Sequence, residues 1–391
     1  MAINKKIIKD NKFGLSNTKK KIGVNYWRFF FNGIQKNGGV ESLFFIEFEM
    51  LNPWDNPEEA TLGFKPRVQI KEEDLQYALS GTESARGLKV EEIVHPSYIV
   101  VRVGKLDENP KQLCQYFSLN DINFIQKPFE IHAGNNLFTE NEINGFVSVS
   151  LSDKTQHPEY FCDNGSANWN LQYDYVKSYG EGFDTGSERW FPSGMNAVFS
   201  GVINFDGEDY LVNQEKSFGY IDRYWGKSFL NEWFHISSCN FTSLISGKTL
   251  LDSSFAIHGI YEDKISLIGN FEGADIIFAP NGNLKNYDCV WNCCESPEAD
   301  EDDDKNIHWS VSVNSKLWVI DIDVFCKVKY LYNRCLECSE GKRKVINILQ
   351  TGEAFGEIKI YKKIKNDLEQ IEYAKINKAL CEFGHVEETQ I

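Results

Sequence analysis

The chain has 391 residues, of which 14% are aromatic, and a formal net charge of −16 from 41 Lys and Arg residues against 57 Asp and Glu residues. This acidic balance repels phosphate backbones and anionic lipid surfaces, which disfavours nucleic-acid binding and electrostatic docking to membranes. Because a chain of this length exceeds one ordinary hydrophobic core, we expect two domains of similar size.

The first residues, MAINKKIIKDNKFG, include lysines but no apolar run of signal-peptide length, and nowhere do about 18 apolar residues follow one another. We therefore expect a cytoplasmic location and no integral membrane segment. The ten cysteines are then expected to be reduced thiols that pack as small apolar side chains. Zinc binding stays open for Cys289, Cys293, Cys294, Cys335 and Cys338, although their spacing lacks the compact pattern of a structural zinc site.

Alternation of apolar and polar residues is typical of strands and dominates the readable segments. In ESLFFIEFEM, residues 41–50, the apolar Phe44, Ile46 and Phe48 fall on one side and Glu47 falls on the other. The same pattern covers 142–151, 168–176, 308–313, 317–325 and 357–361. Hairpin turns are predicted at 37–39, 206–207 and 281–282, and short helices at 71–79 and 366–380.

These patterns predict an all-β protein with few short helices, made of antiparallel barrels or sandwiches. A turn-rich gap at 180–194 separates the strand-rich regions, and we expect an N-terminal domain over 1–185 and a C-terminal domain over 186–391. The acidic tract at 296–306 is interpreted as a solvated loop, because it lacks the glycine-containing loop of a calcium-binding EF-hand.

Familiar catalytic motifs are missing from the sequence. WGKS resembles the end of a phosphate-binding loop, but six residues rather than four separate Gly219 from Gly226. The sequence contains no G-x-S-x-G and no H-E-x-x-H motif. A serine triad or a zinc-bound water therefore has no support, and we expect no cofactor and no metal.

The stretch GYIDRYWGKSFLNEWFH, residues 219–235, gathers rings around a few charges. As a strand, it places Tyr220, Asp222 and Tyr224 on one face and Arg223 on the other. If the first face lines a barrel interior, desolvation would keep part of Asp222 protonated, which is the condition for a general acid. If that face meets water, Asp222 is a surface carboxylate paired with a nearby cation.

The wider segment GYIDRYWGKSFLNEWFHISSCNF resembles the signature of the tocopherol cyclase family and its bacterial relatives. The preceding MNAVFSGVINFDGEDY, the aromatic NYWRFFFNG, FGEIKIYKK and the terminal ALCEFG are similar to other parts of that family. Leu230 stands where the family has Pro, His235 where an aromatic residue is usual, and Ala197 where bacterial relatives carry His.

The resemblance implies two lipocalin-like β-barrel halves that enclose a hydrophobic ligand, with the signature in the second. It also implies a cyclase reaction, in which an acid protonates an olefin of a prenyl tail and a phenol oxygen captures the cation. Neither a metal nor a nucleotide is needed. Such chemistry suits a dry pocket whose ring faces stabilise positive charge.

We therefore predict a protein that binds an isoprenoid, a prenylated quinol or another lipid and cyclises it. Asp222 is the first candidate acid, with Tyr224 and His235 as alternatives or partners. The ligand-binding wall is predicted from Trp27, Tyr220, Trp225, Phe229 and Trp233. The alternative is a carrier of lipids or pigments that kept the cavity and has no catalytic activity.

Overall fold

The computed structural model describes residues 23–53, 60–62, 96–156, 161, 163–186, 188–213, 218–261, 264–280, 287–296, 305–341, 344–365 and 367–387. Almost all elements in these ranges are antiparallel strands. The helical ones are α4 (Leu151–Gln156) and the 3-10 turns η1 (Leu119–Asp121) and η2 (Val328–Tyr330). The predicted all-β fold is confirmed. In the described ranges, no helix has the length and apolar content needed to cross a membrane.

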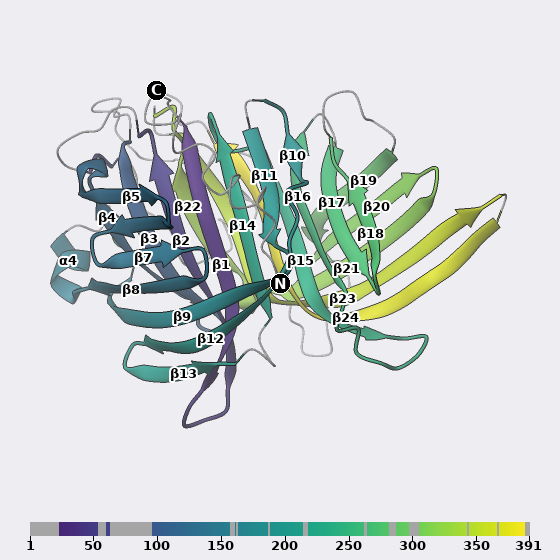
Figure 1. Ribbon diagram of the computed structural model, residues 1–391, viewed down its shortest axis with the longest axis horizontal. Helices are drawn as coiled ribbons and strands as arrows, with labels where there is room; N and C mark the ends of the chain where they lie inside the picture. Colours follow the sequence, from purple (N-terminus) through teal and green to yellow (C-terminus); the bar gives the residue numbers. More distant parts are fainter. Residues whose placement is uncertain are drawn as a thin grey trace.

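The first sheet curls into a nearly closed barrel, which we call the first barrel (Figure 1). Its described strands are β1 (Val24–Gln35), β2 (Glu41–Leu51), β3 (Tyr98–Leu106), β4 (Lys111–Phe117), β5 (Ile122–Gln126), β6 (Phe129–Ala133), β7 (Asn136–Thr139), β8 (Glu142–Val149), β9 (Gly165–Lys177), β10 (Phe183–Asp184), β11 (Glu188–Gly194), β12 (Asn196–Phe205), β13 (Glu208–Val212) and β14 (Gly219–Gly226). They follow the order β10-β11-β14-β1-β13-β12-β9-β8-β7-β6-β5, and β2, β3 and β4 extend from β1.

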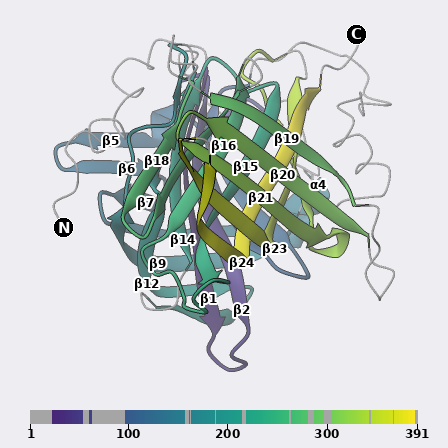
Figure 2. The same ribbon diagram turned by 90° about the vertical axis from the view of Figure 1, so that its right-hand side faces the viewer.

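The second sheet curls less far and forms a half-barrel (Figures 1 and 2). Its described strands are β15 (Glu232–Ser243), β16 (Ser254–Tyr261), β17 (Lys264–Phe271), β18 (Ala274–Phe278), β19 (Tyr287–Glu295), β20 (Asn306–Ser315), β21 (Trp318–Lys327), β22 (Tyr332–Glu337), β23 (Val345–Ile364) and β24 (Asp367–Glu387). The order is β18-β17-β16-β15-β24-β23-β21-β20-β19, with β22 also paired to β23. The sheet therefore has edges at β18 and β19, and it is open between them.

The chain passes from the first sheet to the second at residues 227–231, between β14 and β15. Strands β11 to β14 thus lie in the first sheet although they follow residue 186. The division into domains at 185/186 stays a prediction of the sequence.

The helix predicted over 366–380 is wrong, because residues 367–380 form most of β24, which pairs with both β23 and β15. The apparent helical periodicity of this segment is misleading. The buried residues Ala374 and Ile376 are two positions apart, as in a strand. Pairing on both sides of the strand overrides the helix propensity of its Glu, Ala and Lys residues. The helix predicted at 71–79, the turn at 281–282 and most of the acidic tract lie outside the described residues.

The hairpin predicted at 206–207 joins β12 to β13. Asp206 and Gly207 have φ values of +52° and +85°. Positive φ at both central residues is the requirement of a type I′ turn, which is why Asp-Gly suits this position.

The buried side chains form three clusters. One fills the first barrel and another fills the half-barrel. The third cluster lies between the two sheets and takes residues from β1, β14, β15, β22, β23 and β24. Buried charged residues are concentrated beside this third cluster, and they build the site described next.

Candidate active site

Successive side chains of β14 point alternately into the first barrel and into the space between the two sheets. Ile221 packs inside the first barrel, whereas Tyr220 and Tyr224 pack between the two sheets. Asp222 shares the face of the two tyrosines and is fully buried. Its surroundings are therefore neither a barrel interior nor water but the contact between the sheets.

Asp222 is paired with an arginine of the neighbouring strand β1. The Arg28 Nε and Nη2 groups donate to the two Asp222 oxygens at 2.9 and 2.6 Å. The Trp190 Nε1 group and the Tyr220 hydroxyl also donate to Oδ2, at 3.0 and 3.2 Å. Such a forked, charge-assisted pairing is among the strongest hydrogen-bond arrangements in proteins.

Arg28 also binds a carboxylate of the opposite sheet. Its Nη1 group donates to both oxygens of Glu382 on β24, at 2.7 and 2.8 Å. Glu382 accepts further hydrogen bonds from Trp233 Nε1 at 2.8 Å and from Gln350 Nε2 at 2.7 Å. One guanidinium thus joins the side chains of two buried acidic residues of opposite sheets.

Strand register explains how residues so distant in the sequence meet. In the first sheet, Asp222 lies opposite Arg28, which lies opposite Glu47, which lies opposite Arg102. In the second sheet, neighbouring strands place His258, His235, Glu382, Gln350 and Tyr332 in one row. Facing residues of paired strands project to the same side, so two polar rows come together where the sheets pack.

Charge pairing controls protonation in this group. Burial alone would lower the pKa of Arg28, but Asp222 and Glu382 outweigh it and raise that pKa well above its ordinary value. Burial alone would raise the pKa of Glu382, but Arg28 and His235 outweigh it and lower that pKa. Both groups are therefore charged at neutral pH.

Two buried histidines adjoin the ion pairs. The Trp190 ring stacks on His258 at 4.7 Å between ring centroids, and the Trp233 ring meets His258 edge-on at 4.6 Å. Neither ring nitrogen of His258 has a hydrogen-bond partner in the described part of the chain. We call Arg28, Asp222 and Glu382, together with Trp190, Tyr220, Trp233, His235 and His258, the inter-sheet cluster.

Both imidazoles are neutral at pH 7, because burial lowers the pKa of His235 to about 4 and the pKa of His258 well below its ordinary value. As the pH falls, an unfolded histidine takes up a proton near pH 6.5, while the folded protein resists it. The stability due to the neutral His235 is complete above about pH 6.5 and is lost between pH 6.5 and 4.

We therefore expect the free energy of unfolding to fall by about 3 kcal/mol between pH 6.5 and 4 through His235 alone. Urea unfolding over this pH range measures the loss, and His235→Gln should make the profile flatter. His132→Gln is the matched control, since His132 is partly exposed on β6 and lies outside the buried row of His235. An unchanged slope in His235→Gln would contradict this account.

A second set of buried charges continues the first-sheet row. Arg102 binds Glu47 and also Glu49, whose Oε2 lies 2.9 Å from Nη1. Arg334 of β22 reaches Glu47 across the gap between the sheets, at 2.8 and 2.9 Å. Burial would raise the pKa of Glu47, but Arg334 and Arg102 outweigh it and lower that pKa to about 2.

The structure brings most of the residues predicted from the sequence to the space between the sheets. Tyr224 stacks on Tyr26 and donates its hydroxyl to the carbonyl of Ser228 rather than to Asp222. His235 bonds Ser237 through Nε2 at 3.1 Å, and its ring centroid is 5.3 Å from that of Tyr220. Phe229 packs edge-on against Trp233.

Two predicted wall residues lie elsewhere. Trp27 is inside the first barrel, where the Arg223 guanidinium lies 3.9 Å from its ring centroid. Trp225 is half-buried and lies on the face of β14 opposite to that of Asp222. Burial lowers the pKa of Arg223 to about 9, and its Nη groups donate to the Tyr26 carbonyl and to Asn25 Oδ1 at 3.0 Å.

Sequence reasoning missed Arg28, Glu382, Trp190 and His258. A signal was present for the first two, because each charge stands within an apolar run, YWRFFF and ALCEF. Ionised side chains are rarely buried without a partner, so each run implied a complementary charge elsewhere. Trp190 and His258 carried no comparable signal.

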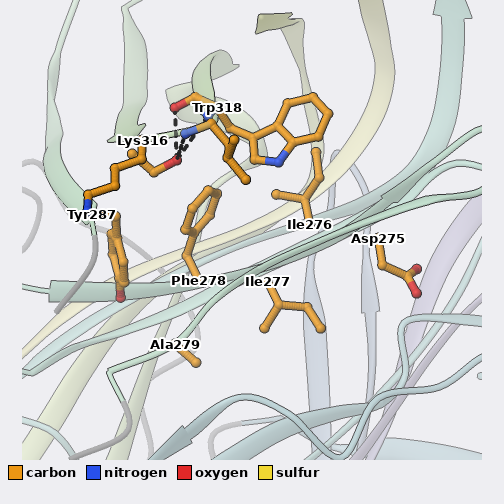
Figure 3. Close-up of a pocket in the computed structure, with 10 residues that line it drawn as sticks. Asp275, Ile276, Ile277, Phe278, Ala279, Tyr287, Lys316 and Trp318 are labelled. Atoms are coloured by element: carbon orange, nitrogen blue, oxygen red, sulfur yellow. Dashed lines mark hydrogen bonds between the residues drawn. The ribbon is translucent and has the colours of Figure 1, made fainter. Parts of the chain in front are cut away.

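A cavity of about 730 Å³ lies at the open side of the half-barrel, and none of its lining residues belongs to the inter-sheet cluster (Figure 3). None of the predicted site residues lines it. Its walls come from β18, the start of β19 and the turn between β20 and β21.

The cysteines proposed for zinc do not converge. Cys293 is in the core of the half-barrel, and Cys338 packs between the sheets. Among the described residues, no three His, Cys, Asp or Glu side chains are placed to hold a metal ion.

No family model and no curated protein matches the sequence. Among solved structures, the chain is similar to a protein of Nitrosomonas europaea provisionally named AttH, with 10% identity, a TM-score of 0.41 and coverage of 93% of this chain and 92% of that one. It is also similar to kievitone hydratase from Nectria haematococca, with 12% identity, a TM-score of 0.40 and coverage of 95% and 92%.

Proposed function

We propose that the protein binds an apolar, unsaturated small molecule of the isoprenoid or prenylated-phenol class and transfers a proton to it at the inter-sheet cluster. The observation that carries the proposal is a fully buried Asp222 whose hydrogen-bond donors are Arg28, Trp190 and Tyr220. Buried ion pairs contribute little to stability compared with apolar side chains of the same volume. Their presence beside aromatic rings and histidines supports a catalytic role.

The reaction begins when a proton leaves the carboxyl group of Asp222 for one carbon of a trisubstituted olefin. The olefin π electrons form the new C–H bond, and the other carbon becomes a tertiary cation. A phenol oxygen of the same molecule donates an electron pair to that carbon and releases its proton, which returns to the carboxylate. Atoms and charge balance, and the net change is an isomerisation.

The surrounding residues suit these steps. Tyr220, Trp190 and Trp233 offer ring faces and edges, and ring faces stabilise a cation. Arg28 Nη2 lies 2.6 Å from Asp222 Oδ2 and can hydrogen-bond the carboxylate that remains after the proton has left. Tyr220 acts as a positioning residue through its hydrogen bond to Asp222.

Native mass spectrometry of the purified protein, with organic extraction of co-purifying molecules, tests the binding part of the proposal. We expect a retained prenylated phenol, quinol or related lipid in a 1:1 ratio. A protein that carries no such molecule and binds none of a panel of prenyl quinols would refute it.

A carrier without catalysis is the second candidate. It is favoured by the bidentate pairing of Asp222, because Arg28 donates to both carboxylate oxygens and so occupies the atoms that would meet a ligand. A carrier would release its ligand unchanged after prolonged incubation, whereas a cyclase would release an isomer of equal mass but different retention time.

A further inference from the structure

The cavity at the open side of the half-barrel shares no lining residue with the inter-sheet cluster and has a distinct chemistry. Its floor is the core of the half-barrel, because Ile276, Phe278 and Tyr287 belong to that core. The Phe278 and Tyr287 rings lie 5.2 Å apart. Trp318 completes the apolar wall, and Figure 3 shows it close to Ile276.

Most polar groups around this cavity already have partners. The Asp275 Oδ1 atom accepts hydrogen bonds from the Tyr179 hydroxyl and from Asn270 Nδ2. The Tyr287 hydroxyl donates to the Ile265 carbonyl at 2.7 Å. The Ser315 hydroxyl accepts from the backbone amides of the β20–β21 turn. The Asp275 Oδ1 atom and the two hydroxyls are therefore engaged, whereas Asp275 Oδ2 accepts no hydrogen bond from the described residues.

Lys316 differs from the other polar residues of the cavity. It is exposed on the β20–β21 turn, and its ammonium has no hydrogen bond or ion pair with the described residues. In Figure 3 its side chain extends toward Tyr287. The ammonium of neighbouring Lys264, by contrast, donates to the Tyr287 carbonyl and lies 3.7 Å from Asp288.

We propose that this cavity binds a long-chain carboxylic acid, with its alkyl chain against Ile276, Phe278 and Trp318 and its carboxylate on Lys316. A volume of about 730 Å³ is within the range of small-molecule sites. An apolar floor with one unpaired cation at its rim matches a molecule with an apolar chain and one anionic end. This cation is present although the chain as a whole has a formal net charge of −16.

Calorimetric titration of the full-length protein with hexadecanoate, below its micelle concentration, tests this proposal. We expect one site, and affinity should rise about fourfold for each methylene that the cavity buries in a series from decanoate to hexadecanoate. Hexadecanol supplies the same chain without the charge. Failure of the wild-type protein to bind hexadecanoate would overturn the proposal.

Lys316→Glu should weaken hexadecanoate binding at least tenfold, because it replaces attraction at the rim by repulsion, and should leave hexadecanol binding unchanged. Lys248→Glu is the matched control, since Lys248 is an exposed lysine of the turn between β15 and β16 and the change in net charge is identical. Equal hexadecanoate affinity in Lys316→Glu and Lys248→Glu would overturn the assignment.

Tryptophan fluorescence locates the ligand. Binding of hexadecanoate should change the emission of Trp318, and Trp318→Phe should lose that change while it still binds in the calorimeter. A change of full size in Trp318→Phe would place the ligand elsewhere. Asp222→Asn should bind hexadecanoate as the wild type does, which separates this site from the proposed function.

Discussion

Replacement of Arg28 with methionine should lower the free energy of unfolding by about 3–5 kcal/mol at pH 7. The substitution keeps an unbranched apolar side chain but removes the guanidinium that binds both Asp222 and Glu382. Asp222 and Glu382 then remain buried with no cation between them. Leaving them without a partner costs more free energy of unfolding than the intact ion pairs contribute. Urea or thermal unfolding measures the change.

Two controls make this result specific. Arg28→Lys keeps the charge but cannot form the fork to two carboxylates, and should fall between the wild type and Arg28→Met. Lys111→Met breaks the partly exposed ion pair with Asp206 and should cost at most about 1 kcal/mol. Because the uncompensated carboxylates take up protons in acid, the deficit of Arg28→Met should shrink as the pH falls. A deficit that is small or independent of pH would contradict the ion-pair description.

Replacement of Asp222 with asparagine should reduce conversion of the bound ligand by about 10²–10⁴-fold, the usual contribution of a positioned acid. Asparagine has nearly the same volume and still accepts hydrogen bonds from Trp190 and Tyr220, so ligand affinity should change little. Arg28 remains paired with Glu382 in this variant. Single-turnover conversion and ligand affinity are the two quantities to compare.

Asp174→Asn is the matched control, because Asp174 is an exposed aspartate at an outward position of β9. It should retain full conversion. If Asp222→Asn converts the ligand at the rate of Asp174→Asn, then Asp222 is not the acid. If neither variant nor the wild type converts it, the carrier function holds.

The sequence predicted the local parts of this structure because local patterns determine them. Alternation separated the face of Asp222 from that of Arg223, and the Asp-Gly pair at 206–207 predicted a hairpin. The strand β24 was missed because its composition favours helix, and only its pairing with β23 and β15 makes it a strand.

The partners of Asp222 could not be predicted in the same way. Arg28 lies 194 residues from Asp222 and 354 residues from Glu382 along the chain. Their meeting depends on the register of β1 against β14 and on the packing of one sheet on the other. Periodicity specifies which face a side chain occupies, but it does not specify which sheet packs on that face.

The most direct test of proton transfer at the inter-sheet cluster is conversion of the extracted ligand in D₂O, followed by mass spectrometry of the product. Protonation of an olefin forms a new carbon–hydrogen bond from an exchangeable proton. We expect one non-exchangeable deuterium per product molecule with the wild-type protein, and neither product nor deuterium above background with Asp222→Asn. A ligand recovered from the wild-type protein without deuterium on carbon would contradict it.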